Sequence, residues 1–212
     1  MPSAHTHFYE PADGHGLAHS PFNSIIAPRP IGWISTQNHA GQLNLAPFSF
    51  FNAFNYTPPI IGFASNGPKD SLLNAESTGE FCWNLADESL AEAMNATSAA
   101  VPSEVDEFAL AGLTPASSRI VSVPHVAEAK AVFECRTSQV VPLVAADGSS
   151  TVTTVVFGEV VGVHIDSSLL EAGVYQTVRS RPLLRGGGPS TYFTIREENI
   201  RDLRRPGTPG GG

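Results

Sequence analysis

The chain has 212 residues, 42% of them hydrophobic, and its 12 basic and 20 acidic side chains give a formal net charge of −8. That length suits one domain with a core of its own. The negative charge argues against a nucleic-acid-binding protein, which needs a basic surface, and no apolar run reaches the roughly 18 residues that cross a membrane. With no secretory signal and only two cysteines, Cys82 and Cys135, both expected to be buried, we expect a cytoplasmic protein.

Residues 1–21 are rich in proline, glycine and histidine, and we expect them to form a flexible arm that packs over a neighbouring subunit. Four histidines in this arm lie in loop-like sequence without ligands at a useful spacing, so we expect no metal site; they are His5, His7, His15 and His19. The folded domain is expected to span residues 22–200, followed by a mobile tail at 201–212.

Three short runs of apolar and aromatic residues, 31–36, 43–52 and 60–65, predict strands at the start of the domain. Pro47 lies inside the second run. Because proline cannot donate a hydrogen bond to a strand ladder, it predicts a sheet edge, a bulge or a barrel corner there.

Helical spacing that begins at Lys69, after the turn Asn66-Gly67-Pro68, predicts a helix that ends at Gly79. Shorter elements are expected in the rest of the domain. They are a strand at 81–85, a helix at 88–98, a short helix at 105–111 in an otherwise irregular stretch, a short helix within 168–180 and a last strand at 191–195.

The clearest pattern is a long hairpin formed by residues 130–144 and 151–165, which are rich in valine, threonine and phenylalanine. Asp147-Gly148 is a favoured two-residue turn. That turn would place Arg136 opposite Glu159 and Cys135 opposite Val160, unless Pro142 introduces a bulge that shifts the register.

Strands outnumber helices in this reading, and most connections are too short for parallel crossovers. We therefore expect a mainly β fold: a closed or nearly closed antiparallel barrel of roughly six strands, Greek-key-like, with a few peripheral helices.

Common catalytic motifs are missing from the sequence. There is no GxSxG, HExxH or CxxC motif, and Gly186-Gly187-Gly188 is neither a GxGxxG motif nor preceded by an apolar strand. A doubly wound dinucleotide-binding fold is therefore not expected.

Polar side chains are concentrated instead among the short strands of residues 24–71. A strand ends at Ser65 and a helix begins near Lys69, so the first-turn N–H groups, with Lys69 and Ser71, could hold a phosphate. The alternative is an ordinary capped helix with Asp70 in its first turn.

Four segments together resemble the flavin reductase-like family, whose members have the FMN-binding split-barrel fold. They read APRPIGWIST (27–36), NLAPFSFFNAFNYTPPIIGFAS (44–65), KDSLLNAESTGEF (69–81) and RPLLRGGGPSTYF (181–193). The likeness covers roughly residues 22–195. Phe48 to Asn52 depart from the S-V-S stretch of the reductase branch, which brings the chain nearer to the flavoredoxin-like branch.

The resemblance implies an isoalloxazine ring along residues 44–52, a phosphate at Ser65, Lys69 and Ser71, and a late segment that approaches across a dimer interface. The cofactor-binding residues it implies are Arg29, Trp33, Ser35, Thr36, Ala46, Pro47, Phe48, Ser49, Phe50, Asn52, Ser65, Lys69, Asp70, Ser71, Arg185 and Gly187. Arg29 and Arg185 are also candidates for stabilising negative charge on the ring.

The function implied is an FMN-dependent oxidoreductase that takes a hydride from NADH or NADPH and passes electrons to an acceptor. The flavin carries this chemistry, so no catalytic side chain and no metal are expected. The implied partners are a second copy of the chain, in a homodimer, and a monooxygenase or other redox protein. Two alternatives stay open: an FMN-binding electron carrier without nicotinamide activity, and a non-flavin binding scaffold.

Overall fold

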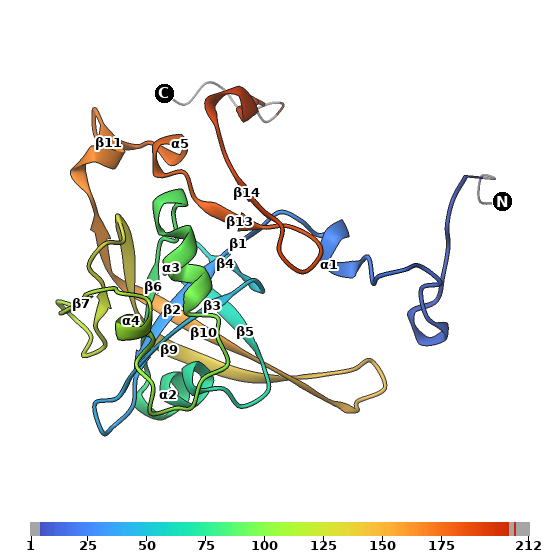
Figure 1. Ribbon diagram of the computed structural model, residues 1–212, viewed down its shortest axis with the longest axis horizontal. Coiled ribbons are helices and arrows are strands. Elements are labelled where there is room, and N and C mark those ends of the chain that lie inside the picture. Colours follow the sequence, from blue (N-terminus) through green and yellow to red (C-terminus); the bar gives the residue numbers. More distant parts are fainter. Residues whose placement is uncertain (1–4, 204–205, 207–212) are drawn as a thin grey trace.

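A computed structural model describes residues 5–203 and 206, and its central feature is a seven-stranded antiparallel sheet in the order β3-β2-β6-β9-β10-β5-β4 (Figure 1). Its strands are β2 (Gly32–Gln37), β3 (Leu43–Phe48), β4 (Phe51–Asn55), β5 (Ile60–Asn66), β6 (Glu80–Asn84), β9 (Ala131–Val144) and β10 (Ser150–Ile165).

Smaller sheets lie around it: β1 (Arg29–Pro30) with β13 (Leu183–Arg185) and β14 (Tyr192–Thr194), β7 (Pro115–Ala116) with β8 (His125–Val126), and β11 (Leu170–Glu171) with β12 (Val174–Tyr175). The α-helices are α1 (Phe22–Ile25), α2 (Asp70–Thr78), α3 (Ala91–Ala96), α4 (Glu107–Leu110) and α5 (Thr177–Ser180). Four 3-10 helices are η1 (Pro11–Asp13), η2 (Glu88–Leu90), η3 (Ser167–Leu169) and η4 (Glu197–Asn199). None of the described helices is long and apolar enough to cross a bilayer.

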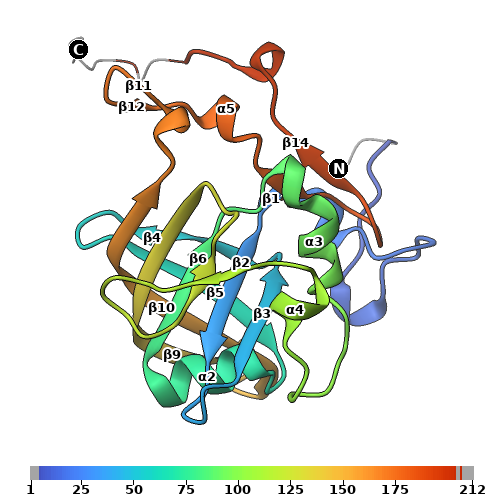
Figure 2. The ribbon, with the colours of Figure 1, turned by 60° about the vertical axis from the view of Figure 1, so that its left-hand side comes forward.

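The large sheet curls into a barrel because its two edge strands follow one another in the chain (Figure 2). Only Ser49 and Phe50 separate β3 from β4, and the Phe50 carbonyl accepts a hydrogen bond from the N–H of Ala64 on β5. The expected mainly β, antiparallel fold is confirmed. The single strand expected at 43–52 is two strands, and Pro47 lies on the edge strand β3, opposite Trp33 on β2.

The β9–β10 hairpin, which extends beyond the barrel in Figure 1, corrects the expected turn. The Ala145 carbonyl accepts from Gly148 N–H, and Ala145 N–H donates to the carbonyl of Ser149. The loop therefore has three residues, with Gly148 in the left-handed region at φ 84°, instead of the two-residue Asp147-Gly148 turn. Register shifts further along the ladder restore the expected pairs of Arg136 with Glu159 and Cys135 with Val160.

Aromatic side chains fill the interior of the barrel. Phe63 packs against Phe48 and Phe81, with ring centroids 4.7 and 5.4 Å apart. Gly158 makes room for this packing, because a Cβ there would lie 2.4 Å from Phe81 Cε1. Cys135 is buried in the same cluster.

A second core lies outside the barrel, where α3 and α4 cover β2 and β3 (Figure 2). Trp33, Leu45, Met94 and Phe108 are buried there. Cys82 is also buried and, like Cys135, is a free thiol, as expected. Burial raises the pKa of Cys82 to about 12 and that of Cys135 well above its usual value, so both side chains stay protonated.

The N-terminal part of the described chain lies apart from the barrel. Residues 5–21 extend away from it beyond α1 (Figure 1); the flexibility of this arm and its packing on a neighbouring subunit stay predictions. Most of the tail expected at 201–212 lies outside the described residues.

Glu134, fully buried on β9, fastens the loop of residues 119–121 to the outer face of the barrel. Its carboxylate accepts hydrogen bonds from the N–H groups of Arg119, Ile120 and Val121 at 2.7–3.0 Å and from His164 Nε2 at 2.5 Å. Burial alone would raise the pKa of Glu134, but these donors lower it to about 2. The group is therefore ionised at neutral pH.

We predict that Glu134→Gln lowers the free energy of unfolding by about 2–4 kcal/mol at pH 7, because an amide cannot accept from all four donors. The folded-state pKa of Glu134 is depressed, so its contribution is complete above the ordinary glutamate value of about 4.3 and is lost as pH falls through about 2. Urea titrations of both proteins at several pH values measure the difference. The control is Glu128→Gln, where an exposed carboxylate accepts from Thr114 N–H; an equal loss in both variants would contradict the prediction.

Candidate functional site

A cleft of about 360 Å³ lies where the edge strand β3 meets the N-terminus of α2. Its third wall is the irregular segment 97–103. The lining residues are Asn44, Ala46, Pro47, Phe48, Pro68, Lys69, Asp70, Ser71, Thr97, Ser98, Ala99, Ala100, Val101, Ser103 and Glu107. We call it the β3–α2 cleft.

The turn between β5 and α2 presents the start of the helix to this cleft. Gly67 takes a φ of 87°, and the Ser65 hydroxyl donates to its carbonyl at 2.8 Å. Lys69 is the N-cap residue, and its side chain makes no capping hydrogen bond. The first-turn N–H groups of an α-helix have no intrahelical acceptor, so this end of α2 attracts anions. The Lys69 ammonium is exposed and has no partner among the residues described.

Buried amides and hydroxyls form a network behind the cleft. Asn44 Nδ2 donates to Ser71 Oγ at 2.7 Å and to Thr36 Oγ1 at 3.2 Å, and Asn74 Nδ2 donates to Thr36 Oγ1 at 3.1 Å. Because Ser71 Oγ accepts from Asn44, its own proton is available to an acceptor in the cleft.

Two carboxylates oppose the positive charge of Lys69. Asp70 accepts a hydrogen bond from Ser103 Oγ at 2.9 Å. Glu107, only 7% exposed, accepts from Leu45 N–H on the free edge of β3 at 3.1 Å. Burial raises the pKa of Glu107, and the nearby charge of Asp70 also raises it. The hydrogen bond from Leu45 N–H acts in the opposite direction and lowers it.

A second cleft of about 390 Å³ lies around the β3–β4 turn and is mostly apolar. It is lined by Ile26, Pro28, Arg29, Pro30, Phe50, Phe51, Asn52, Phe54, Gly62, Phe63, Ala64 and Val155. We call it the aromatic cleft.

Arg29 is the one cation in the lining of the aromatic cleft. Its guanidinium donates to the carbonyls of Ser49, Asn23 and Gly186 and lies 5.7 Å from the centroid of the Phe50 ring. Burial and the nearby charge of Arg185, its cross-strand partner, both lower the pKa of Arg29. No ion pair with a carboxylate neutralises Arg29 or Arg185 within residues 5–203.

The structure divides the residues expected to bind a cofactor into separate groups. The β3–α2 cleft brings together Ala46, Pro47, Phe48, Lys69, Asp70 and Ser71. The aromatic cleft contains Arg29, Phe50 and Asn52, with the Ser49 carbonyl bound to Arg29. Thr36 and Ser65 are buried behind the first cleft.

The remaining expected residues lie elsewhere. Trp33 is fully buried in the outer core and donates from Nε1 to Thr97 Oγ1 at 2.9 Å, and Ser35 Oγ accepts from Asn84 Nδ2. Arg185 donates to three carbonyls of its own loop, at Gly188, Pro189 and Thr191. Gly187 packs on Ser24, where a Cβ would lie 2.0 Å from the hydroxyl oxygen.

The residues that sequence reasoning left out are Glu107 and the whole wall at 97–103. That wall has no periodic pattern, and its small residues carry no motif. The available signal was the acidic pair Asp106-Glu107, of which Asp106 caps α4 by accepting from Phe108 and Ala109 N–H. Glu107 directly follows this capping residue as the first residue of α4, and its carboxylate reaches Leu45 N–H on the edge of β3.

Comparison with known proteins gives one consistent picture. Residues 25–184 match the family described as "Flavin reductase like domain". A protein of Aquifex aeolicus is 38% identical over 170 residues, covering 77% of this chain and 83% of its own length. YwrF of Bacillus subtilis is 32% identical over 184 residues, covering 83% and 88%.

Two solved structures have similar folds at recognisable sequence identity. Nitrilotriacetate monooxygenase component B from Bacillus cereus superposes with a TM-score of 0.80 at 33% identity, covering 86% of this chain and 90% of that one. The 2-nitrobenzoate 2-nitroreductase NbaA of Pseudomonas fluorescens gives 0.76 at 26% identity, covering 90% and 92%. A flavoredoxin of Desulfovibrio vulgaris, at 18% identity and a TM-score of 0.73, shares the fold.

We predict that Glu107→Gln changes how stability depends on pH. The folded-state pKa of Glu107 is raised, so its contribution is present at acidic pH and is lost as pH rises through that value. The glutamine can still accept from Leu45 N–H and does not ionise. Urea titrations are therefore expected to show that wild type loses more stability than the variant between about pH 4 and pH 8. Parallel stability curves for the two proteins would contradict this.

Proposed function

The chain belongs to the flavin reductase-like family, and from that premise we propose that it binds FMN in the β3–α2 cleft, takes a hydride from NADH or NADPH onto the flavin and passes the electrons to an acceptor. The observation that carries the proposal is the meeting of β3 with the start of α2. The N-terminus of α2, the Lys69 ammonium, which has no partner in the described part of the chain, and the buried Ser71 hydroxyl offer donors to a phosphate in a cleft of about 360 Å³.

The residues of the β3–α2 cleft fit a phosphorylated flavin on the donor side. Lys69 Nζ, the Ser71 hydroxyl and the first-turn N–H groups can all point to one anion. The two carboxylates are each engaged, Asp70 by Ser103 and Glu107 by Leu45, so neither competes freely for these donors. Burial raises the pKa of Glu107 and so disfavours its charged form.

The bound flavin would supply the hydride and electron chemistry, and the chain's own part is to bind and orient it. The free edge of β3 provides the ring contacts. Glu107 occupies the outward N–H of Leu45, and Pro47, two residues on, has no N–H to offer. The Pro47 carbonyl, outward by strand alternation, is then an acceptor for a ring N–H. Phe48 closes the hydrophobic side of the cleft.

The aromatic cleft supports nicotinamide-dependent reduction over a simple electron carrier. It adjoins the β3–β4 turn, is large enough for a second planar ligand, and holds the unneutralised cation Arg29. A ring bound there would be close to the strand that holds the flavin, and the positive potential of Arg29 and Arg185 would favour negative charge at this turn. A carrier that only exchanges electrons with a protein has no need of a second ligand cleft.

We propose that the chain forms a homodimer and that its acceptor is a partner redox protein. The far half of the β9–β10 hairpin exposes the large apolar residues Val141, Leu143, Val144 and Val152, and the end of β4 and the turn after it expose Phe54 and Tyr56. Exposed apolar side chains gathered on one projecting hairpin are typical of an interface. The similarity to a monooxygenase component supports an oxygenase as the partner.

Replacing Lys69 tests the phosphate cradle. Lys69→Ala is expected to weaken FMN binding by roughly 1.5–3 kcal/mol, because a charge-assisted hydrogen bond is lost. Titration of apoprotein with FMN, followed by quenching of flavin fluorescence, measures the affinity. Lys69→Arg keeps the charge and should retain most of it, and Arg201→Gln, at a remote exposed arginine, should retain all of it. Equal affinity of Lys69→Ala and wild type would reject the assignment.

Anaerobic mixing with reduced nicotinamides tests the reaction itself. The visible absorbance of the bound flavin should bleach on adding NADH or NADPH if the proposed hydride transfer occurs. Bleaching by neither nucleotide, with FMN bound, would favour the electron carrier. A purified protein that binds no FMN would leave only the scaffold.

A further inference from the structure

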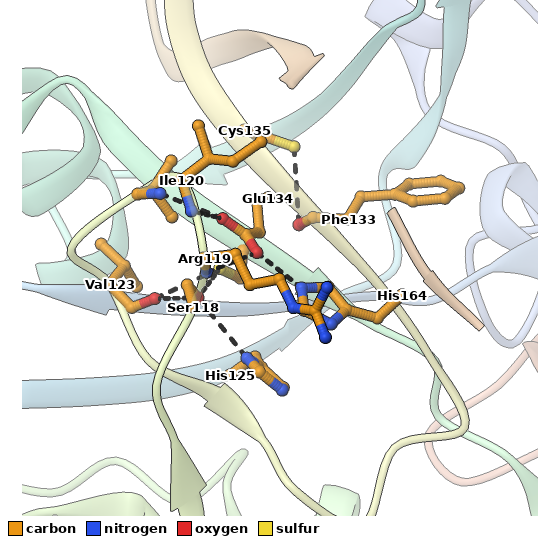
Figure 3. Close-up of polar contacts among 11 residues, drawn as sticks. Ser118, Arg119, Ile120, Val123, His125, Phe133, Glu134, Cys135 and His164 are labelled. Atoms are coloured by element: carbon orange, nitrogen blue, oxygen red, sulfur yellow. Dashed lines mark hydrogen bonds and ion pairs between the residues drawn. The ribbon is translucent and has the colours of Figure 1, made fainter. Parts of the chain in front are cut away.

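A groove of about 360 Å³ lies on the outer face of β9 and β10, and none of its residues lines either cleft described above. It is lined by Arg119, Ile120, Glu134, Gly162, Val163, His164 and Ile165. We call it the Arg119–His164 groove. Figure 3 shows its polar residues, with the Arg119 side chain running from the loop toward the His164 ring.

Glu134 sets the hydrogen-bonding state of His164. The carboxylate is ionised and can only accept, so His164 Nε2 carries a proton and donates it at 2.5 Å. His164 Nδ1 is therefore the ring nitrogen left for the groove, and it becomes a donor when the imidazole is protonated. The His164 side chain is 27% exposed, so a ligand can reach it.

His125 supports the His164 ring from β8. The two ring centroids are 4.8 Å apart. Ser118 Oγ donates to the Val123 carbonyl, so it can accept from His125 Nδ1, which lies 3.4 Å away. Burial lowers the pKa of His125, and the nearby His164 lowers it further. Together these effects outweigh that of Glu134, which raises it. Charge on His125 is therefore disfavoured, and its ring serves as a support for the His164 ring.

Arg119 provides the second cation of the groove. Its backbone N–H binds Glu134, but its guanidinium has no hydrogen-bond or ion-pair partner in the described part of the chain. The lining includes one carboxylate, Glu134, whose oxygens are already taken by four donors. The Arg119 guanidinium and His164 Nδ1, which have no hydrogen-bond partner among the described residues, are therefore the groups that an anion in the groove would meet.

An apolar side chain lies beside these two groups. Ile120, next to Arg119 on the loop, is 48% exposed although it is large and hydrophobic. Val163 and Ile165 alternate with His164 along β10, so their side chains point to the opposite face of the strand. A ligand that covered Ile120 would remove its surface from water while its anionic end met Arg119. A planar guanidinium matches the two oxygens of a carboxylate through parallel N–H···O bonds.

We propose that the Arg119–His164 groove binds a carboxylate that carries an apolar group, with Arg119 holding both carboxylate oxygens, His164 Nδ1 donating to one of them, and Ile120 packing against the apolar group. The ligand is separate from the flavin and from the nicotinamide of the proposed reaction. It binds on the outside of the barrel.

The test uses the full chain saturated with FMN, so that the flavin site is filled, at about pH 6, near the ordinary pKa of histidine. Benzoate is the probe, and benzamide, with the same ring and no charge, is its matched control. Isothermal titration calorimetry measures binding to wild type, Arg119→Gln and His164→Gln. Arg201→Gln removes the same charge from an exposed arginine whose guanidinium binds only nearby backbone carbonyls, and is the control variant.

The expected result is saturable benzoate binding to wild type and to Arg201→Gln, a loss of about tenfold or more in Arg119→Gln, a smaller loss in His164→Gln, and much weaker binding of benzamide. Equal binding of benzoate to wild type and Arg119→Gln, or no saturable binding at all, would overturn the proposal. Inorganic phosphate that displaces benzoate at equal concentration would also overturn it, because a general anion site would then replace a carboxylate site.

Discussion

The hydrogen bond from Arg29 to the carbonyl of Ser49 is the contact on which both clefts depend. It holds the turn at which the chain leaves β3 and starts β4, so the two edges of one curled sheet meet there. On one side of the turn the free edge of β3 faces α2, and on the other Phe50 and Asn52 face the aromatic cleft. The same guanidinium also binds Asn23 and Gly186, which joins α1 and the glycine-rich loop to the turn.

Glu107 provides a hydrogen-bond acceptor for the free edge of β3. An edge strand leaves alternate N–H groups without partners, and a buried, unpaired N–H is costly. The Glu107 carboxylate takes the N–H of Leu45 in place of a further strand. The cost is a buried carboxylate near Asp70, in a cleft that we propose for a phosphate. Burial raises the pKa of Glu107, so the same position that satisfies Leu45 N–H disfavours the charged carboxylate.

The sequence predicted the parts of the fold that local chemistry determines. The β5–α2 unit followed from helical spacing and from Gly67 and Gly79, which both adopt positive φ values. The break at Ser49 and Phe50 was not visible, because residues 43–52 read as one continuous apolar run. Nor could the sequence orient Trp33, since β2 is buried on both faces and alternation carries no information there. The wall at 97–103 depends on the packing of α3 and α4, which no local pattern encodes.

Strand β9 joins the Arg119–His164 groove on the outer face of the barrel to the packed interior. Glu134 points outward and fastens residues 119–121, whereas its neighbour Cys135 points inward and packs in the aromatic core. The ladder has register shifts between Val160 and Gly162 and between Phe157 and Gly158. Gly158 faces Phe81 inside the barrel, and a Cβ on Gly162 would lie 3.1 Å from Glu134 outside it. Strand β10 therefore lines both sites, the Arg119–His164 groove through His164 and the aromatic cleft through Val155.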